Sequence, residues 1–250
     1  MCGRYALTTT PAALSKLFGV LMKLQLTPRF NVAPTQMMPV VVNEAGEREI
    51  MLMRWGLIPS WAKDASIGSR LINARSETAA GKPAFRSAFK QRRCVVPASG
   101  FYEWMKTGGA KQPYFITRAD GQSLGLAGLW ENWTDPDSGK ELRTFTILTT
   151  DANEALKPLH DRMPVILEPE DVGRWLGERK KKGSDAAELT DLLRPAADGV
   201  LALRPVSSRV NSPKNDDASV LDPVPGIESP KPSRRSRKTG KPASPGLFDS

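Results

Sequence analysis

Cysteine, histidine and long apolar runs are scarce in this chain of 250 residues. Its two cysteines, Cys2 and Cys94, and its one histidine, His160, cannot build a disulfide framework or a four-ligand zinc site. No apolar run approaches the ~18–20 residues of a membrane span, and the first residues show no signal-peptide pattern. We therefore expect a reducing, cytoplasmic setting (nucleoid-associated in a bacterium), with no membrane, metal or other cofactor.

The charge is positive and unevenly distributed along the chain. The net charge is +9, and 229–250 alone contribute +5. A mildly basic body with a basic tail favours a polyanionic partner such as nucleic acid, with a plain solvated surface as the alternative. From Asp222 onward the sequence is rich in proline, serine and basic residues. It predicts a folded domain over 1–221 and a disordered basic tail over 222–250.

Short β-forming runs outnumber helical patterns in the body of the chain. Candidate strands are 39–42, 49–55, 93–97, 114–117, 124–129, 143–149 and 164–167. Helical patterns cover 11–18 after a capping Thr10, 169–178 and 185–193. Since strands and helices do not alternate regularly, the prediction is an α+β fold: an antiparallel-rich, curled or barrel-like sheet with peripheral helices.

Cys2 follows Met1 directly and is the first candidate for chemistry. Removal of Met1 would leave Cys2 with a thiol and an α-amine on neighbouring carbons. The α-amine titrates near ~8, against ~10.4 for a lysine, so part of it is neutral and nucleophilic at pH 7. We expect the thiol to be activated as a thiolate. Such a group can attack an acyl carbon through sulfur, or condense with an aldehyde through both atoms to form a thiazolidine ring.

Three polar residues lie in segments that could assist this chemistry. His160 lies in a loop before an apolar strand, where it is either an acid–base group or an idle loop residue. Glu103 is flanked by Tyr102 and Trp104, so it is either a desolvated proton donor or a solvent-facing strand residue. Asn73 can orient a reacting group or simply cap a turn before a helix starting at Ser76.

Aromatic and basic side chains suggest a surface for nucleic acid. Trp55 and Trp61 flank a Gly/Pro loop; Trp55 reads as core, and Trp61 is the better candidate for stacking on bases. Cys94 reads as a buried strand cysteine without a catalytic role. The candidate DNA contacts are Arg4, Asn31, Pro34, Trp61, Arg75, Arg162, Arg209 and Lys214.

Six motifs occur together in a specific order. They are Met1-Cys2-Gly3-Arg4, Asn31-Val32-Ala33-Pro34-Thr35, Trp55-Gly56-Leu57-Ile58-Pro59, Ile72-Asn73-Ala74-Arg75-Ser76-Glu77-Thr78, Gly100-Phe101-Tyr102-Glu103-Trp104 and Leu159-His160-Asp161-Arg162-Met163-Pro164. This set resembles the SOS-response-associated peptidase (SRAP) family from Cys2 to about Asp216. The resemblance implies a nucleophilic Cys2 surrounded by Asn73, Glu103 and His160. It also implies a covalent thiazolidine crosslink to abasic sites in single-stranded DNA, a lyase-like activity of the DNA damage response.

Other readings stay open on the sequence. An N-terminal-nucleophile amidohydrolase or cysteine peptidase would use Cys2 on an acyl carbon and form no DNA adduct. The family name leaves room for a self-processing peptidase limited to residues ahead of Cys2. A non-enzymatic single-strand-binding module would leave Cys2 idle. In the tail, Leu247 and Phe248 loosely resemble peptides that bind replication sliding clamps, against the alternative of non-specific phosphate attraction.

Overall fold

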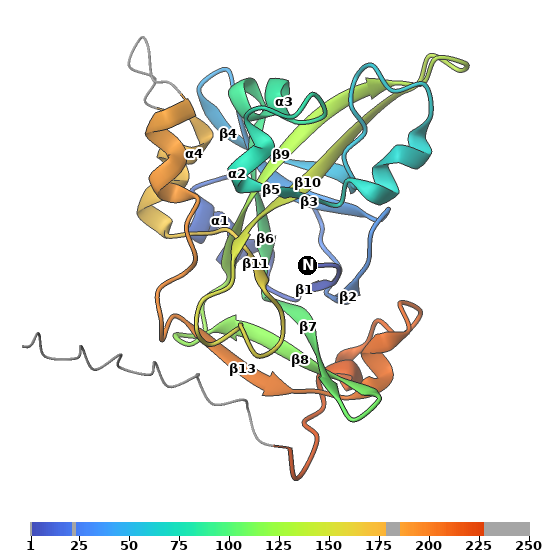
Figure 1. Cartoon of the computed structure of the whole chain (residues 1–250). Helices are drawn as coiled ribbons and strands as arrows, with labels where there is room; N and C mark the ends of the chain where they lie inside the picture. Colours follow the sequence, from blue (N-terminus) through green and yellow to red (C-terminus); the bar gives the residue numbers. More distant parts are fainter. Residues whose placement is uncertain (1, 22–23, 179–185, 228–250) are drawn as a thin grey trace, which may run out of the picture.

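A closed five-stranded barrel forms the body of the protein (Figure 1). The structure, a computed structural model, describes residues 2–21, 24–178 and 186–227. In order around the barrel, the strands are β10 (Glu141–Asp151), β4 (Glu47–Trp55), β3 (Met37–Glu44), β6 (Arg93–Ala98) and β9 (Leu124–Thr134), and β9 pairs with β10 to close it. Every neighbouring pair is antiparallel except β4 and β10. The predicted α+β fold with a barrel-like, antiparallel-rich sheet is confirmed.

Three short strands extend the barrel beside β10 and β9. They are β5 (Asn73–Arg75), parallel to β10, β11 (Arg162–Pro164), antiparallel to β10, and β12 (Ile166–Leu167), antiparallel to β9. Thr149 of β10 pairs with Arg75 on one side and Pro164 on the other. The segments that carry Asn73 and His160 are thereby brought to the same end of one long strand.

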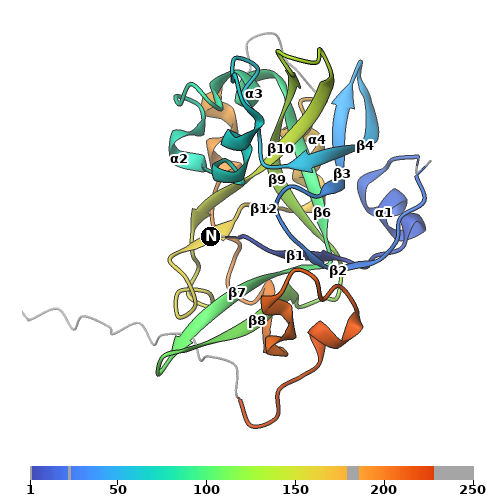
Figure 2. The ribbon, with the colours of Figure 1, turned by 90° about the vertical axis from the view of Figure 1, so that its right-hand side faces the viewer.

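A second, wholly antiparallel sheet lies below the barrel in Figure 1. Its order is β13 (Leu201–Pro205), β8 (Ala110–Arg118), β7 (Gly100–Thr107), β1 (Tyr5–Leu7) and β2 (Arg29–Val32). In the second view, β7 and β8 run as a long hairpin away from the barrel (Figure 2). β1 pairs with β7 at Gly100 and Phe101, so among the residues that the structure describes no strand pairs with the outer part of β7 on this edge.

Gly100 is required where the two sheets meet. A Cβ atom there would approach the Ile116 carbonyl oxygen at 2.6 Å and the Phe115 ring at 2.5 Å, which is too close for any side chain. The chain can therefore pass directly from β6 of the barrel into β7 of the second sheet. This step places Glu103 three residues beyond the junction.

The barrel interior is filled by β-branched and aromatic side chains, as strand preferences would suggest. Val40, Val41, Met53 and Trp55 are fully enclosed or nearly so. The Trp55 ring packs edge-on against Tyr5, with centroids 5.2 Å apart, and stacks on Phe145 at 6.4 Å. The predictions that Trp55 belongs to the core and that Cys94 is a buried strand cysteine are confirmed.

Short helices lie around the two sheets. The α-helices are α1 (Pro11–Phe18), α2 (Ser76–Ala79), α3 (Arg86–Gln91) and α4 (Val172–Leu176). The 3-10 helices are η1 (Ala65–Arg70), η2 (Pro169–Asp171), η3 (Ala186–Leu192), η4 (Ser208–Asn211) and η5 (Ala218–Leu221). Among them, η4 and η5 pack against the second sheet. Helix 11–18 has its predicted bounds, and the Thr10 hydroxyl accepts from the Ala13 N–H. The predicted helix 169–178 is split into η2 and α4 and ends at Gly177, which adopts a left-handed conformation.

Backbone contacts continue slightly past the predicted end of the folded domain. The Ser207 N–H donates to the Asp222 carbonyl (3.0 Å), and Val206 forms a bridge with Pro223. Residues 228–250 lie outside the described residues, and with them Leu247, Phe248 and the basic cluster of the tail. The division at residue 222 and the sliding-clamp contact stay predictions. Within the described ranges, no helix combines the length and the apolar character that crossing a membrane requires.

Candidate active site

Cys2 lies just before β1, where the barrel and the second sheet meet, and is fully buried. The Asn73 side-chain amide donates to the Cys2 carbonyl oxygen (2.8 Å). Asn73 is held in turn by β5: the Ile72 carbonyl accepts from the Trp55 indole N–H (2.9 Å) and from the Ile147 N–H (3.1 Å). Asn73 therefore links Cys2 to the barrel wall, which is more than the turn-capping role that its sequence also allowed.

The Cys2 thiol is protonated in this environment. Burial, together with the Glu103 carboxylate, raises the pKa of the thiol to about 12, against a weak contact of Sγ with the Arg4 carbonyl at 3.9 Å. The expectation of a thiolate is thus wrong for this arrangement, because desolvation outweighs any activating group. A Cys2 that reacts here would rely on its α-amine first and on a neutral thiol afterwards.

Glu103 lies on β7 with 4% of its surface exposed, so it is not a solvent-facing strand residue. Burial raises the pKa of its carboxyl above the usual range. The pairing of β1 with β7, continued by the bond from the Tyr102 N–H to the Arg4 carbonyl (3.0 Å), brings Glu103 beside the segment that starts at Cys2. A carboxyl with a raised pKa can give a proton to a leaving hydroxyl and take one back near neutral pH.

Glu103 and His160 line one pocket of about 630 Å³. The pocket lies beside the free edge of β7, and its remaining lining residues are Trp104, Lys106, Lys111, Pro158, Leu159 and Asn211. The Trp104 indole N–H donates to the Asn211 side-chain oxygen (2.7 Å), which ties η4 to β7. Segments 100–111, 158–160 and 207–211 are far apart in sequence and converge on this single opening.

His160 is half-buried and neutral near pH 7, because burial lowers its pKa. The Arg162 backbone N–H donates to His160 Nδ1 (2.9 Å), which requires that nitrogen to carry no proton. Asp161 Oδ1 lies 2.7 Å from the same nitrogen and favours a proton there, but its side chain is 85% exposed and screened by water. We therefore assign the ring proton to Nε2, which leaves Nδ1 as the acceptor.

Comparison with known proteins identifies the family of the chain. The family model described as SOS response associated peptidase (SRAP) matches residues 1–213. The chain belongs to the SRAP family. Abasic site processing protein YoqW of Bacillus subtilis is 39% identical to this SRAP protein over 226 residues, covering 89% of this chain and 99% of that protein. Abasic site processing protein HMCES of Gallus gallus is 33% identical, covering 90% and 78%.

A solved structure shows the same fold. The crystal structure of a protein from Bacteroides thetaiotaomicron superimposes on this SRAP protein with a TM-score of 0.80 at 27% identity. The match covers 89% of this chain and 100% of that one. The fold of this chain is therefore shared with that solved structure.

The candidate DNA contacts of this SRAP protein fall into two groups. In the first, the side chains reach solvent. Trp61 is 60% exposed, Arg75 and Lys214 are exposed, and Pro34 is partly exposed. Arg209 is also exposed, although it donates to the Ser219 hydroxyl (2.9 Å) and lies 3.7 Å from Asp217. These side chains are free to meet a ligand without breaking the fold.

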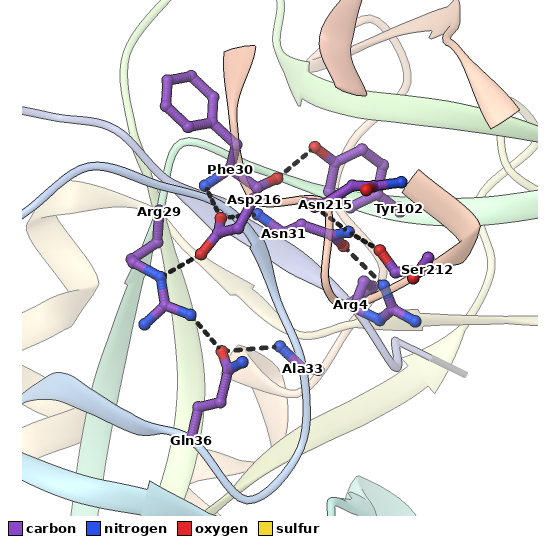
Figure 3. A network of polar contacts seen from close by, with 10 residues as sticks. All are labelled: Arg4, Arg29, Phe30, Asn31, Ala33, Gln36, Tyr102, Ser212, Asn215 and Asp216. Carbon is purple, nitrogen blue, oxygen red and sulfur yellow. Dashed lines mark hydrogen bonds and ion pairs between the residues drawn. The ribbon is translucent and has the colours of Figure 1, made fainter. Parts of the chain in front are cut away.

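The second group is engaged inside the protein, in a network that ties loop 207–217 to β1 and β2 (Figure 3). Asn31 is fully buried, and its amide donates to the carbonyls of Val210, Ser212 and Asn215. The Arg4 guanidinium donates to the Asn31 side-chain oxygen (2.7 Å). The geometry gives Asn31 a structural role, and direct contact of its side chain with DNA would require breaking these bonds.

Arg162 is the other enclosed candidate. Its guanidinium donates to both carboxylate oxygens of Glu77 (2.8 and 2.9 Å), to Asp151 (2.7 Å) and to the Thr149 carbonyl (2.6 Å). These contacts join α2 to β10 directly behind His160. Arg162 thus fixes the loop that carries the histidine, whatever else it contacts.

Four pocket residues were missed in the sequence: Trp104 as a wall, Lys106, Lys111 and Asn211. The sequence could have indicated that the two lysines lie side by side. They flank Gly108 and Gly109, a dipeptide typical of two-residue hairpins. No local sequence pattern predicts the position of Asn211, because only the tertiary fold brings η4 against β7. In the ranges that the structure describes, no cluster of three His, Cys, Asp or Glu side chains is arranged to hold a metal ion.

Proposed function

We propose that this protein forms a covalent thiazolidine crosslink between Cys2 and the aldehyde of an abasic site in single-stranded DNA. The observation that carries the proposal is the convergence around Cys2: Asn73 donates to its carbonyl, the pairing of β1 with β7 brings Glu103 beside its segment, and His160 shares a pocket with Glu103. The relatives named abasic site processing proteins support the same substrate. The physiological role would be to shield a damaged strand during repair.

The reaction needs no oxidant or cofactor. After Met1 is removed, the neutral α-amine of Cys2 adds to the aldehyde carbon of the ring-opened sugar, and loss of one water gives an imine. The Cys2 S–H then adds across the C=N bond. Sulfur bonds to carbon, the thiol proton passes to nitrogen, and a five-membered ring closes. The proton that the thiol loses is the one that the ring nitrogen gains, so ring closure needs no proton from outside.

Each neighbouring residue has a role that follows from its environment. Glu103, with its raised pKa, gives a proton to the departing hydroxyl and recovers it from the amine. His160, neutral with its proton on Nε2, donates a hydrogen bond to the sugar oxygen as the ring opens. Asn73 holds the Cys2 backbone, which fixes the direction in which the amine points.

The DNA strand would lie over exposed aromatic and basic side chains. Trp61 offers a ring for stacking on an unpaired base, and Arg75 and Lys214 offer cations for phosphates. Duplex DNA cannot present an unstacked base to Trp61, so single strands are favoured.

The main alternative is an N-terminal-nucleophile peptidase or amidohydrolase. Such an enzyme needs a sulfur nucleophile poised as a thiolate, as cysteine hydrolases do. Burial pushes the pKa of the Cys2 thiol in the opposite direction. Any peptidase character is therefore assigned to removal of residues ahead of Cys2 and not to turnover of other proteins.

The test is crosslinking to an oligonucleotide that contains one abasic site, read by denaturing gel and intact mass. Wild type should give an adduct whose mass is the sum of both components less one water, on protein that starts at Cys2. Cys2→Ala should abolish it, and Cys94→Ala, which removes a buried thiol elsewhere in the same core, should retain it. An adduct on protein that keeps Met1 would overturn the mechanism, because a blocked amine cannot close the ring.

A further inference from the structure

The pocket that holds Glu103 and His160 continues outward along the β7–β8 hairpin to two lysines. Lys106 on β7 and Lys111 on β8 are directly opposite each other in the strand register. The hairpin closes one residue further on through Gly108 and Gly109, both with positive φ. Tight closure by this turn fixes the two ammonium groups on the same face of the hairpin.

Two like charges in this position oppose folding. Side chains directly opposite on antiparallel strands lie within about 5.5 Å at Cβ, and like charges there destabilise the sheet. Both lysines are exposed, and within the described ranges neither forms an ion pair or a side-chain hydrogen bond. A bound anion between them would convert this repulsion into attraction.

The position of the lysine pair indicates which anion fits. Lys106 is three residues beyond Glu103 on the same strand, about 10 Å at the usual rise of a β-strand. Glu103 faces the opposite side of β7 from Lys106, and the pocket reaches both sides around the outer edge of the strand. Its wall there is formed by Trp104, which shares a face with Lys106 and is held by Asn211. A nucleotide that reacts beside Glu103 would therefore send the backbone of its own strand along this wall toward the lysines.

We propose that Lys106 and Lys111 together bind a backbone phosphate of the damaged strand, next to the abasic nucleotide. The inference rests on the proposed function and adds a subsite to it. Trp61, which follows β4, and Arg75, in β5, would serve the part of the strand on the barrel side, and the lysine pair on β7 and β8 would serve the part that leaves over the hairpin. Held on both sides of the reacting sugar, the aldehyde would stay beside Cys2 while the imine forms.

The test compares Lys106→Ala plus Lys111→Ala with a charge-matched control. Lys16→Ala plus Lys90→Ala removes the same two charges from exposed helix positions on α1 and α3. Reversible binding is measured by fluorescence anisotropy over a range of salt, with a single-stranded oligonucleotide that carries a tetrahydrofuran abasic analogue and so cannot crosslink. We expect the salt slope of the hairpin variant to fall by about 0.7, the value for one lost phosphate contact on a single strand, and the control slope to stay at the wild-type value.

A second arm locates the phosphate. Oligonucleotides with one uncharged methylphosphonate linkage, placed in turn on each side of the abasic site, should weaken binding to wild type at one flank. The hairpin variant should lose nothing more at that flank, since its contact is already gone. Equal losses in wild type and variant at every linkage, or an unchanged salt slope, would overturn the inference.

Two further readouts separate the possible failures. Thermal unfolding of the hairpin variant should match or exceed wild type, because a like-charge pair is removed, so weaker binding cannot be attributed to misfolding. Crosslinking to the aldehyde oligonucleotide should slow at low DNA concentration and recover at saturation. Wild type that forms no crosslink would refute the proposed function itself. A wild type that crosslinks, with a hairpin variant that binds like the control, would refute only the lysine subsite.

Discussion

At the scale of single residues, the burial of Glu103 has two opposite effects. It suits the carboxyl for proton transfer, and it lowers the stability of the folded protein near neutral pH. Folding buries its carboxyl and raises its pKa, so the folded state favours the protonated form. Below the unfolded pKa of about 4.3 both states are protonated and ionisation costs nothing. As pH rises from there to the raised folded pKa, only the unfolded state releases its proton, and stability falls by about 1.4 kcal/mol per unit of difference.

Glu103→Gln should remove this pH dependence. We expect the melting temperature of the variant to equal that of wild type near pH 4 and to exceed it at pH 8, while crosslinking slows ~10²-fold for want of a proton donor. Calorimetry at the two pH values and single-turnover crosslinking measure both effects. Glu49→Gln, at an exposed strand position, is the control and should change neither. A variant less stable than wild type at pH 8 would contradict the assigned burial cost.

The residues of the candidate site could be proposed from the sequence, but their environments could not. Cys2, Asn73, Glu103 and His160 stand out in sequence because each lies in a recognisable motif. The direction of the Cys2 pKa shift depends on how deeply the thiol is buried, which packing between two sheets decides. In the same way, Asn31 resembles an exposed polar residue until loop 207–217 covers it.

At the scale of elements, loop 207–217 is fastened to β2 mainly by Asp216. Its carboxylate accepts from the backbone N–H groups of Phe30 (2.6 Å) and Asn31 (2.8 Å) and pairs with Arg29 (Figure 3). Asp216→Ala would leave both N–H groups without their acceptor. We expect a loss of about 2–3 kcal/mol in the free energy of unfolding, measured by urea titration. Asp198→Ala, at an exposed loop position, should lose less than 0.5 kcal/mol, as surface changes usually do.

The elements themselves were predictable where the local sequence carries a strong preference. The valine-rich run in β3 and the capped helix α1 are examples. β1, β2 and β13 were missed, because three to five residues give no clear alternation. The parallel pairing of β4 with β10 joins residues about 90 positions apart in the sequence. The closure of the barrel by β9 depends on the register of the β9–β10 hairpin. No local sequence pattern specifies either one.

At the scale of the whole molecule, the excess of positive charge divides into cations that hold the fold and cations that face solvent. Arg162 belongs to the first kind, with its guanidinium enclosed by Glu77, Asp151 and the Thr149 carbonyl. Arg75 belongs to the second: it is exposed at the end of β5, and no ion pair or side-chain hydrogen bond engages it within the described ranges. Their positions on either side of β10 place both near Cys2, so position alone does not separate their roles.

Alanine substitution should separate them by what each variant loses. Arg75→Ala should keep the wild-type free energy of unfolding and lower the salt slope of single-strand binding by about 0.7, the value of one phosphate contact. Arg162→Ala should lose about 2 kcal/mol of stability, because charge-assisted bonds to three partners disappear and two carboxylates lose their counter-ion. Urea unfolding and salt-dependent anisotropy on the same preparations give both numbers. If Arg75→Ala were destabilised while its salt slope stayed at the wild-type value, the division between structural and DNA-facing cations would be wrong, and the strand would have to cross a different face of the barrel.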